Sequence, residues 1–117
     1  MLDRTYADAQ IALIEHEPAT IGSLSQALES AGYPAPRGIT DPQQIPPSLD
    51  SAQLDLVIFD VLLPGIDSCA LLADLIRTLP SDAFLPILAT GPLLDPETRQ
   101  RAMEAGAKDF LTKPIDL

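Results

Sequence analysis

Several polar residues of this chain stand directly after short apolar runs, where their side chains could take part in chemistry. Asp60 is the clearest of them, because it follows the run Leu56-Val57-Ile58-Phe59 and precedes a turn at Pro64-Gly65. A carboxylate at the carboxyl end of a buried parallel strand lies where open α/β sheets place their ligand sites. From this stretch alone, Asp60 could equally be the cap of the turn that follows. The other residues in such positions are Glu15, His16, Glu17, Thr90 and Lys113.

Brought together, these side chains would suit a phosphoryl group. Carboxylates such as Glu15 and Asp60 repel each other unless a cation lies between them, and hard divalent cations prefer oxygen ligands. The ammonium group of Lys113 could neutralise phosphoryl oxygens, and the hydroxyl group of Thr90 could donate a hydrogen bond to one of them. Asp60 could then be the nucleophile, since aspartyl phosphates are established covalent intermediates. The alternative is that Thr90 merely ends a strand and that Lys113 is a solvated charge.

The elements that must position these residues alternate between strand and helix. Apolar runs without polar alternation predict buried strands at residues 11–14, 56–59 and 86–89, and a shorter strand at 107–111. Two prolines limit residues 35–40 to an edge strand. Apolar spacing and first-turn prolines predict helices over 18–31, 67–79 and 96–105, and a short or irregular helix that begins near residue 42. This alternation predicts an α/β fold with a parallel sheet, whose strand ends meet at one edge.

The composition is that of one soluble domain. The 117 residues are 46% hydrophobic and 21% charged, enough for a single sizeable core. The 17 acidic residues outnumber the 7 basic ones and give a net charge of −10, which argues against direct binding to nucleic acid. The lone Cys69 excludes an internal disulfide and fits a reducing compartment. Neither a signal peptide nor a membrane span is visible, so we expect a cytoplasmic location without membrane contact.

Other phosphate and nucleophile chemistries are disfavoured. The chain has no Gly-Lys-Ser or Gly-Lys-Thr loop and no Gly-x-Gly-x-x-Gly fingerprint. A phosphatase of the haloacid-dehalogenase type would need a second aspartate two residues after Asp60, where Leu62 stands. Cys69 falls on an expected helix, far along the chain from His16, so a thiol nucleophile is also disfavoured.

Four segments of the chain resemble the receiver domain of bacterial two-component response regulators. They follow that family's order and spacing across residues 10–116, and the four together make the match specific. The segments are Ile14-Glu15-His16-Glu17-Pro18, Asp60 through Asp67, Ala89-Thr90-Gly91, and residues 105–114, which read Ala-Gly-Ala-Lys-Asp-Phe-Leu-Thr-Lys-Pro. The resemblance implies a flavodoxin-like, doubly wound five-stranded parallel sheet of order 2-1-3-4-5, in a single receiver domain over residues 1–117.

The resemblance also implies roles for individual residues in a phosphorelay. Asp60 would accept a phosphoryl group from a partner histidine kinase, and Lys113 would contact the phosphoryl oxygens. Thr90 and Phe110 would form a switch pair, Thr90 turning toward the new phosphoryl group and Phe110 turning inward. The Lys113–Pro114 peptide bond would be cis. The domain itself would not be an enzyme beyond catalysing its own phosphoryl transfer and hydrolysis.

The expected metal site departs from the family pattern. Receivers usually carry two acidic residues after the first strand, and the second binds Mg²⁺ directly. Glu15 fits the first position, but His16 occupies the second, and imidazole is a poor Mg²⁺ ligand but a good one for softer divalent ions. With Asp60 and the backbone carbonyl of Leu62 as further ligands, we expect weakened Mg²⁺ binding, with Glu17 or water filling in or Mn²⁺ replacing Mg²⁺. The alternative is a phosphorylation-independent pseudo-receiver that acts as a protein–protein interaction module.

The chain stops at Leu117, where receivers usually continue into a fifth amphipathic helix. We therefore expect these residues to be the N-terminal part of a longer protein that carries a C-terminal output domain or acts on a partner protein. Without the last helix, the first helix alone would cover one face of the sheet. The exposed apolar area would favour self-association, with a homodimer as one form.

Overall fold

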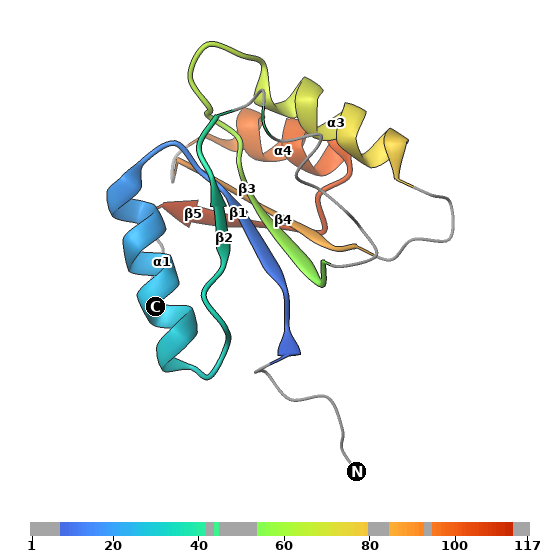
Figure 1. Ribbon diagram of the computed structural model, residues 1–117. Helices are drawn as coiled ribbons and strands as arrows, with labels where there is room; N and C mark the ends of the chain where they lie inside the picture. The colour runs from blue at the N-terminus through green and yellow to red at the C-terminus, as the bar shows by residue number, and fades with distance from the viewer. Residues whose placement is uncertain (1–7, 42–43, 45–53, 80–84, 93–94, 114–117) are drawn as a thin grey trace.

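A five-stranded parallel sheet forms the centre of the computed structural model, which describes residues 8–41, 44, 54–79, 85–92 and 95–113. The strands are β1 (Ile11–Ile14), β2 (Arg37–Ile39), β3 (Leu56–Asp60), β4 (Ile87–Pro92) and β5 (Asp109–Lys113). The helices are α1 (Pro18–Ser30), α3 (Ser68–Thr78) and α4 (Pro96–Ala105). The strand order is β2-β1-β3-β4-β5, which confirms the predicted flavodoxin-like fold (Figure 1).

The register of the sheet decides which residues meet at its carboxyl edge. Ile14 of β1 is paired with Phe59 of β3, so the residues that follow them, 15 and 60, are neighbours. Asp60 is paired with Thr90 of β4. Because every pair is parallel, the last residues of β1, β3 and β5 all reach the same edge.

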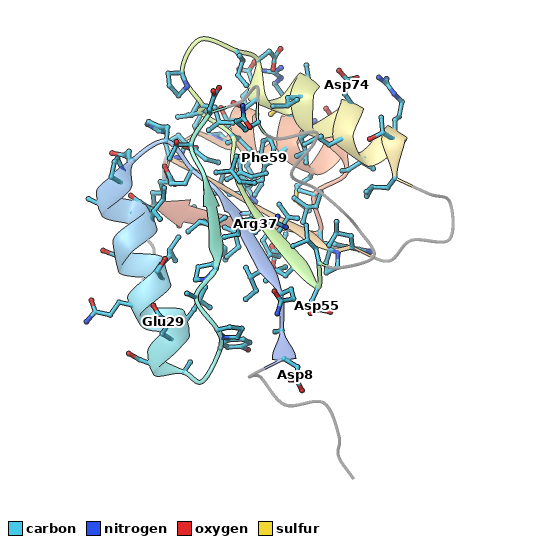
Figure 2. All side chains as sticks on the ribbon, in the orientation of Figure 1. Asp8, Glu29, Arg37, Asp55, Phe59 and Asp74 are labelled. Atoms are coloured by element: carbon cyan, nitrogen blue, oxygen red, sulfur yellow. The ribbon has the colours of Figure 1, made fainter. Side chains whose placement is uncertain are left out.

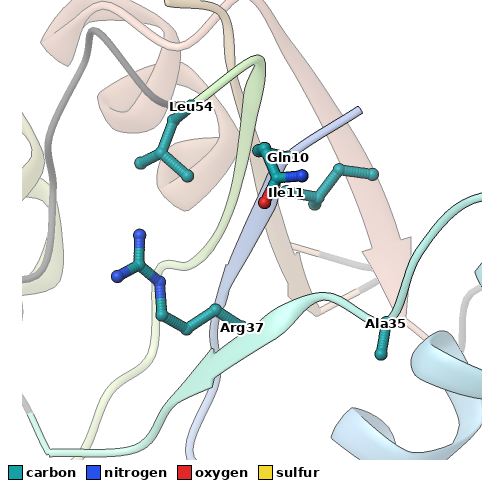
Figure 3. A pocket seen from close by; sticks show the side chains of 5 residues that line it. All are labelled: Gln10, Ile11, Ala35, Arg37 and Leu54. Carbon is teal, nitrogen blue, oxygen red and sulfur yellow. The ribbon is translucent and has the colours of Figure 1, made fainter. Parts of the chain in front are cut away.

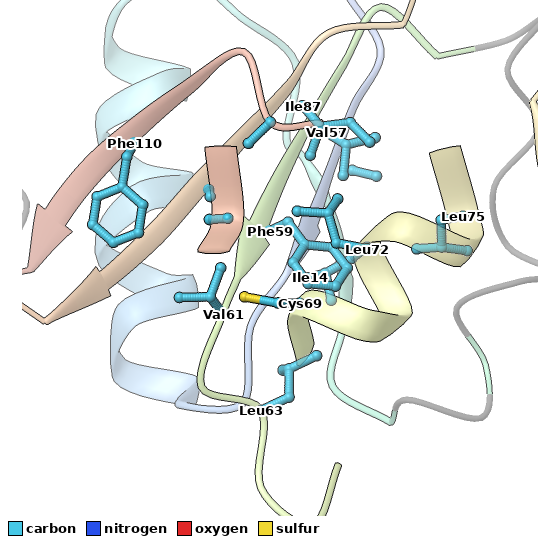
Figure 4. Packing of buried hydrophobic residues seen from close by; sticks show 14 of the residues in the cluster. Ile14, Val57, Phe59, Val61, Leu63, Cys69, Leu72, Leu75, Ile87 and Phe110 are labelled. Carbon is cyan, nitrogen blue, oxygen red and sulfur yellow. The ribbon is translucent and has the colours of Figure 1, made fainter. Parts of the chain in front are cut away.

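The two faces of the sheet are covered by different helices. α1 lies on one face, and α3 and α4 lie on the other (Figure 1). Successive strand residues point to opposite faces, so Leu13 packs with Leu24 of α1, whereas Ile14 belongs to the cluster that contains Leu72 of α3. Phe59 is fully buried in that second cluster (Figure 4). Charged residues occupy the outer surfaces of the helices, for example Glu29 and Asp74 (Figure 2).

Local capping chemistry sets the ends of the helices. Asp67 is the N-cap of α3, since its carboxylate accepts a hydrogen bond from the backbone N–H of Ala70. Asp95 caps α4 in the same way through Thr98, and Pro96 occupies the first helical position. α4 ends at Gly106, whose φ of +119° is the left-handed conformation that glycine adopts at low cost.

The predicted bounds of four strands differ from those observed. β2 is shorter than the predicted range 35–40, and β3 extends one residue further, to Asp60. β4 continues to Pro92 instead of ending at residue 89, because its pairing with β5 extends to the register partners Pro92 and Lys113. β5 begins at Asp109 instead of residue 107. The reason is that the backbone N–H of Ala107 still bonds to the carbonyl of Ala102 and therefore belongs to the turn that closes α4. Lys113 is thus the last residue of the strand and does not follow it.

Some predictions fall outside the described residues. These are the irregular helix from residue 42, apart from residue 44, and the cis peptide at Lys113–Pro114. Among the residues that the structure describes, no helix combines the length and the apolar character needed to cross a bilayer.

Candidate functional site

The carboxyl edge of the sheet gathers the acidic and basic residues that the sequence singled out. Glu15 directly follows β1, Asp60 ends β3 and Lys113 ends β5. Lys113 Nζ lies 2.7 Å from Glu15 Oε1 and 3.6 Å from Asp60 Oδ2. The predicted convergence of these three side chains is therefore present in the structure.

Asp60 is a buried carboxylate with a partner for each oxygen. The side chain is 1% exposed, and Oδ1 accepts a hydrogen bond of 2.9 Å from the backbone N–H of Leu62. Oδ2 lies 2.5 Å from Nδ1 of His16. Burial by itself raises the pKa of Asp60, but the hydrogen bonds from Leu62 and His16 and the charge of Lys113 outweigh it and hold the pKa below its usual value. Asp60 is consequently ionised at neutral pH, as a nucleophile must be.

Glu15 is fixed by its own backbone and by Lys113. Its Oε2 accepts hydrogen bonds from the backbone N–H groups of His16, at 3.0 Å, and Glu17, at 3.1 Å. Its Oε1 forms the 2.7 Å ion pair with Lys113, and the side chain is 1% exposed. Both oxygens of this buried carboxylate therefore have polar partners.

Lys113 is the positive centre of the site. Its ammonium group faces Glu15, Asp60 and, at 3.6 Å, the exposed Glu17. Burial lowers the pKa of Lys113, but the hydrogen bond to Glu15 and the charges of the three carboxylates outweigh it, so the pKa is raised. Glu17, which the sequence suggested as a substitute metal ligand, is here a partner of Lys113.

His16 lies between the two buried carboxylates. Its Nδ1 is 3.3 Å from Glu15 Oε2 and 2.5 Å from Asp60 Oδ2, and the side chain is one-third exposed. One donor atom each from Glu15, His16 and Asp60 lie within 4.8 Å of one another, a spacing that a single metal ion can bridge. The donor set fits a divalent cation in charge and spacing. It differs from an all-oxygen Mg²⁺ site by one nitrogen.

The remaining predicted residues border this cluster. Thr90 is 1% exposed and is paired in register with Asp60. Phe110, 6% exposed, lies inside the core rather than at the surface, and a Cβ added at Gly91 would be only 2.6 Å from its Cζ. Leu62 donates its N–H to Asp60, while its side chain is half exposed. The structure therefore brings Thr90 close to Asp60 and places the Phe110 ring inward.

Sequence reasoning missed two contacts that shape the loop after Asp60. Ser68 Oγ accepts a 2.8 Å hydrogen bond from the buried N–H of Leu63, which fastens the loop to the start of α3. Arg101 of α4 reaches both carboxylate oxygens of Asp67 at 3.0 Å. The first had a local signal, because serine favours helix starts. The second joins residues 34 positions apart and had none.

A hollow lies at the opposite end of the sheet. Its volume is about 560 Å³, and it is lined by residues that precede or begin the strands (Figure 3): Gln10, Ile11, Ala35, Arg37 and Leu54. Arg37 is the one charged side chain among these five lining residues.

The chain is similar in sequence to one protein family and to several known proteins. The model of the response regulator receiver domain family matches residues 11–117. The transcriptional regulatory protein TcrA of Mycobacterium tuberculosis is 32% identical over 108 residues, which cover 92% of this chain and 41% of TcrA. The cyclic di-GMP phosphodiesterase response regulator RpfG of Xanthomonas campestris is 39% identical over 66 residues, or 56% of this chain and 17% of RpfG. The chain thus spans less than half the length of these relatives.

Solved structures show the same architecture. A putative response regulator from Chloroflexus aurantiacus superposes with a TM-score of 0.74 at 34% identity, with 92% of this chain and 88% of that chain covered. The signal receiver domain of a DNA-binding response regulator from Colwellia psychrerythraea gives a TM-score of 0.81 at 23% identity, with 94% and 89% covered. At the latter identity the likeness concerns the fold alone.

Proposed function

Because this chain belongs to the response regulator receiver domain family of two-component signalling, we propose that Asp60 accepts a phosphoryl group from a histidine kinase and thereby switches an output partner. The observation that carries the proposal is the position of Asp60: a buried, ionised carboxylate with the ammonium group of Lys113 3.6 Å away. A carboxylate in this setting can attack phosphorus while a fixed cation stabilises the charge on the phosphoryl oxygens.

The transfer step assigns a task to each side chain. A carboxylate oxygen of Asp60 forms a bond to phosphorus, the bond from phosphorus to the donor imidazole breaks, and that imidazole recovers a proton. The ammonium group of Lys113 contacts the new phosphoryl oxygens and gives up part of its contact with Glu15. The hydroxyl group of Thr90 donates a hydrogen bond to one of the phosphoryl oxygens. A divalent cation held by Glu15, His16 and Asp60, with the carbonyl of Leu62, would supply additional positive charge.

The proposed switch depends on how Phe110 packs against Gly91. In the structure, Phe110 lies inward against Gly91, next to the strand position of Thr90. We propose that movement of Thr90 toward a phosphoryl group on Asp60 stabilises this inward position relative to an outward one. The two populations differ in the surface they offer to a partner.

The output partner belongs to the proposal as well. The relatives named above are a transcriptional regulatory protein and a cyclic di-GMP phosphodiesterase response regulator, and this chain matches only a part of each. We propose that the receiver acts on a C-terminal output domain or on a partner protein, or through a homodimer. Direct binding to nucleic acid is not proposed, given the net charge of −10.

A phosphorylation-independent role is favoured by one contact. The 2.5 Å approach of His16 Nδ1 to Asp60 Oδ2 already occupies one oxygen of the carboxylate that a phosphoryl transfer would use. In that case the domain would act through protein contacts alone, as a pseudo-receiver.

One experiment separates the two functions. The protein is incubated with acetyl phosphate and either Mg²⁺ or Mn²⁺, and its mass is measured. Phosphorylation predicts the gain of one phosphoryl group, absent from the Asp60→Asn variant, which keeps the size of the side chain. A protein that gains no mass with either metal, while remaining folded, would refute the phosphoacceptor function and leave the interaction module.

A further inference from the structure

We infer that His16 is a metal ligand that makes the carboxyl-edge site selective for divalent ions of the later transition series, such as Co²⁺, Ni²⁺ and Zn²⁺, over Mg²⁺. The inference deepens the proposed function, since it rests on the same metal-assisted site. It concerns which ion that site takes.

The position of the ring nitrogen carries the inference. Nδ1 of His16 points at Asp60 Oδ2, at 2.5 Å, and lies 3.3 Å from Glu15 Oε2, so the nitrogen is directed into the space between the two carboxylates. A cation drawn to Glu15 and Asp60 must enter this space. It therefore either binds the ring nitrogen or displaces the ring from both carboxylates.

The chemistry of the ion decides between these outcomes. Mg²⁺ dehydrates reluctantly and demands oxygen ligands, so it gains nothing from imidazole and loses the contact between His16 and Asp60. Co²⁺, Ni²⁺ and Zn²⁺ bind imidazole nitrogen well, so for them His16 exchanges its hydrogen bond to Asp60 for a bond to the metal, with the ring proton carried on Nε2 instead of Nδ1. All four ions carry the same charge, and the attraction of the carboxylates is therefore common to them. The difference in affinity between the ions therefore arises from their interaction with His16.

Two other residues near the cluster do not explain such a preference. Glu17 is more than half exposed, and its carboxylate forms an ion pair of 3.6 Å with Lys113. Lys113 repels every cation alike. Replacement of Glu17 by glutamine therefore provides a matched control, one position along the same loop.

The test uses the untagged chain, in which His16 is the only histidine. Binding of Co²⁺ and of Mg²⁺ is measured by calorimetry for the wild type, His16→Asp and Glu17→Gln. We expect His16→Asp to shift the ratio of Co²⁺ to Mg²⁺ affinity toward Mg²⁺ by at least about tenfold. Glu17→Gln should leave this ratio unchanged. Proton NMR of the Co²⁺-loaded wild type should show strongly shifted ring protons from one coordinated histidine.

The outcomes are decisive in both directions. Shifted histidine ring protons together with the change of ratio in His16→Asp support the inference. Bound Co²⁺ without shifted ring protons, a ratio that changes less than about twofold, or no binding of either ion would overturn it. The NMR measurement on the wild type stands even where a variant fails to fold. The mass gain with acetyl phosphate is read separately, so histidine ligation without phosphorylation would refute the proposed function and keep this inference.

Discussion

Replacement of Lys113 by methionine tests whether this lysine holds the two buried carboxylates together. Methionine keeps an unbranched side chain of similar length but removes the ammonium group. Glu15 and Asp60, each 1% exposed, would then keep their negative charges without the cation that now lies 2.7 Å and 3.6 Å from them. Removal of one partner from a fully buried ion pair costs about 3 to 5 kcal/mol. Because Lys113 is itself 20% exposed, we expect a loss of about 2 to 3 kcal/mol in the free energy of unfolding.

The pH dependence of this loss identifies its cause. A carboxyl group whose pKa is depressed in the folded state contributes stability above its unfolded pKa, and this contribution is lost as the pH falls through the folded pKa. Loss of Lys113 removes one of the influences that depress the pKa of Asp60, so the folded pKa rises in the variant. The stability difference between wild type and variant should therefore be largest near neutral pH and shrink as the pH falls below the ordinary pKa of aspartate toward the depressed pKa of Asp60.

Urea unfolding at neutral and at acidic pH measures this difference. Lys108→Met is the matched control, because the same chemical change is made at an exposed lysine just before β5. We expect Lys108→Met to change stability by less than about 0.5 kcal/mol. If Lys113→Met cost no more than this control, or if its cost were the same at both pH values, the electrostatic account of the site would be refuted.

Three further substitutions test the packing that positions the site. Ser68→Ala leaves the buried N–H of Leu63 without its acceptor and should lower the free energy of unfolding by about 1 to 3 kcal/mol, measured by urea denaturation. Gly91→Ala places a Cβ 2.6 Å from Phe110 and should cost about 1 to 3 kcal/mol while changing the NMR signals of that ring. Phe59→Ala removes a fully buried ring beneath the site and should cost about 3 to 5 kcal/mol by thermal or urea unfolding.

Each of these substitutions has a control. Ser23→Ala removes a hydroxyl group from an exposed position of α1 and should be nearly neutral. The variant Gly91→Ala, Phe110→Leu should lose less stability than the sum of its two single changes, since the shorter side chain makes room for the methyl group. Phe59→Leu should cost less than Phe59→Ala. Equal costs within any of these comparisons would contradict the packing described here.

The sequence predicted the fold because its strongest signals are local. Val57, Ile58 and Phe59 have no polar neighbour within the run, which is typical of a strand covered on both faces. The later start of β5, at Asp109, has a different cause. The N–H of Ala107 still bonds to the carbonyl of Ala102 in the turn that closes α4, and the apolar pattern of residues 107–111 does not indicate this bond.

The residues of the site could be predicted from the sequence, but the ion pairs that they form could not. Strand ends supplied Glu15, Asp60 and Lys113, because parallel strands deliver such residues to one edge. The partner of each charge depends on side-chain reach across the sheet. Lys113 pairs most closely with Glu15, 98 positions away in the chain, and lies farther from Asp60. This choice follows from the longer glutamate side chain and from the backbone N–H groups that fix it.

The balance of charge at this edge explains why a cation matters to any phosphoryl chemistry here. Glu15, Glu17 and Asp60 together face one ammonium group, so these four side chains carry a net negative charge. A phosphoryl donor is also negative, and in a partly buried site its repulsion is weakly screened. The same negative charge that opposes the donor attracts a divalent ion. A divalent ion bound at this edge would therefore offset the negative charge that repels the phosphoryl donor. His16, as a ligand, would influence which ion binds.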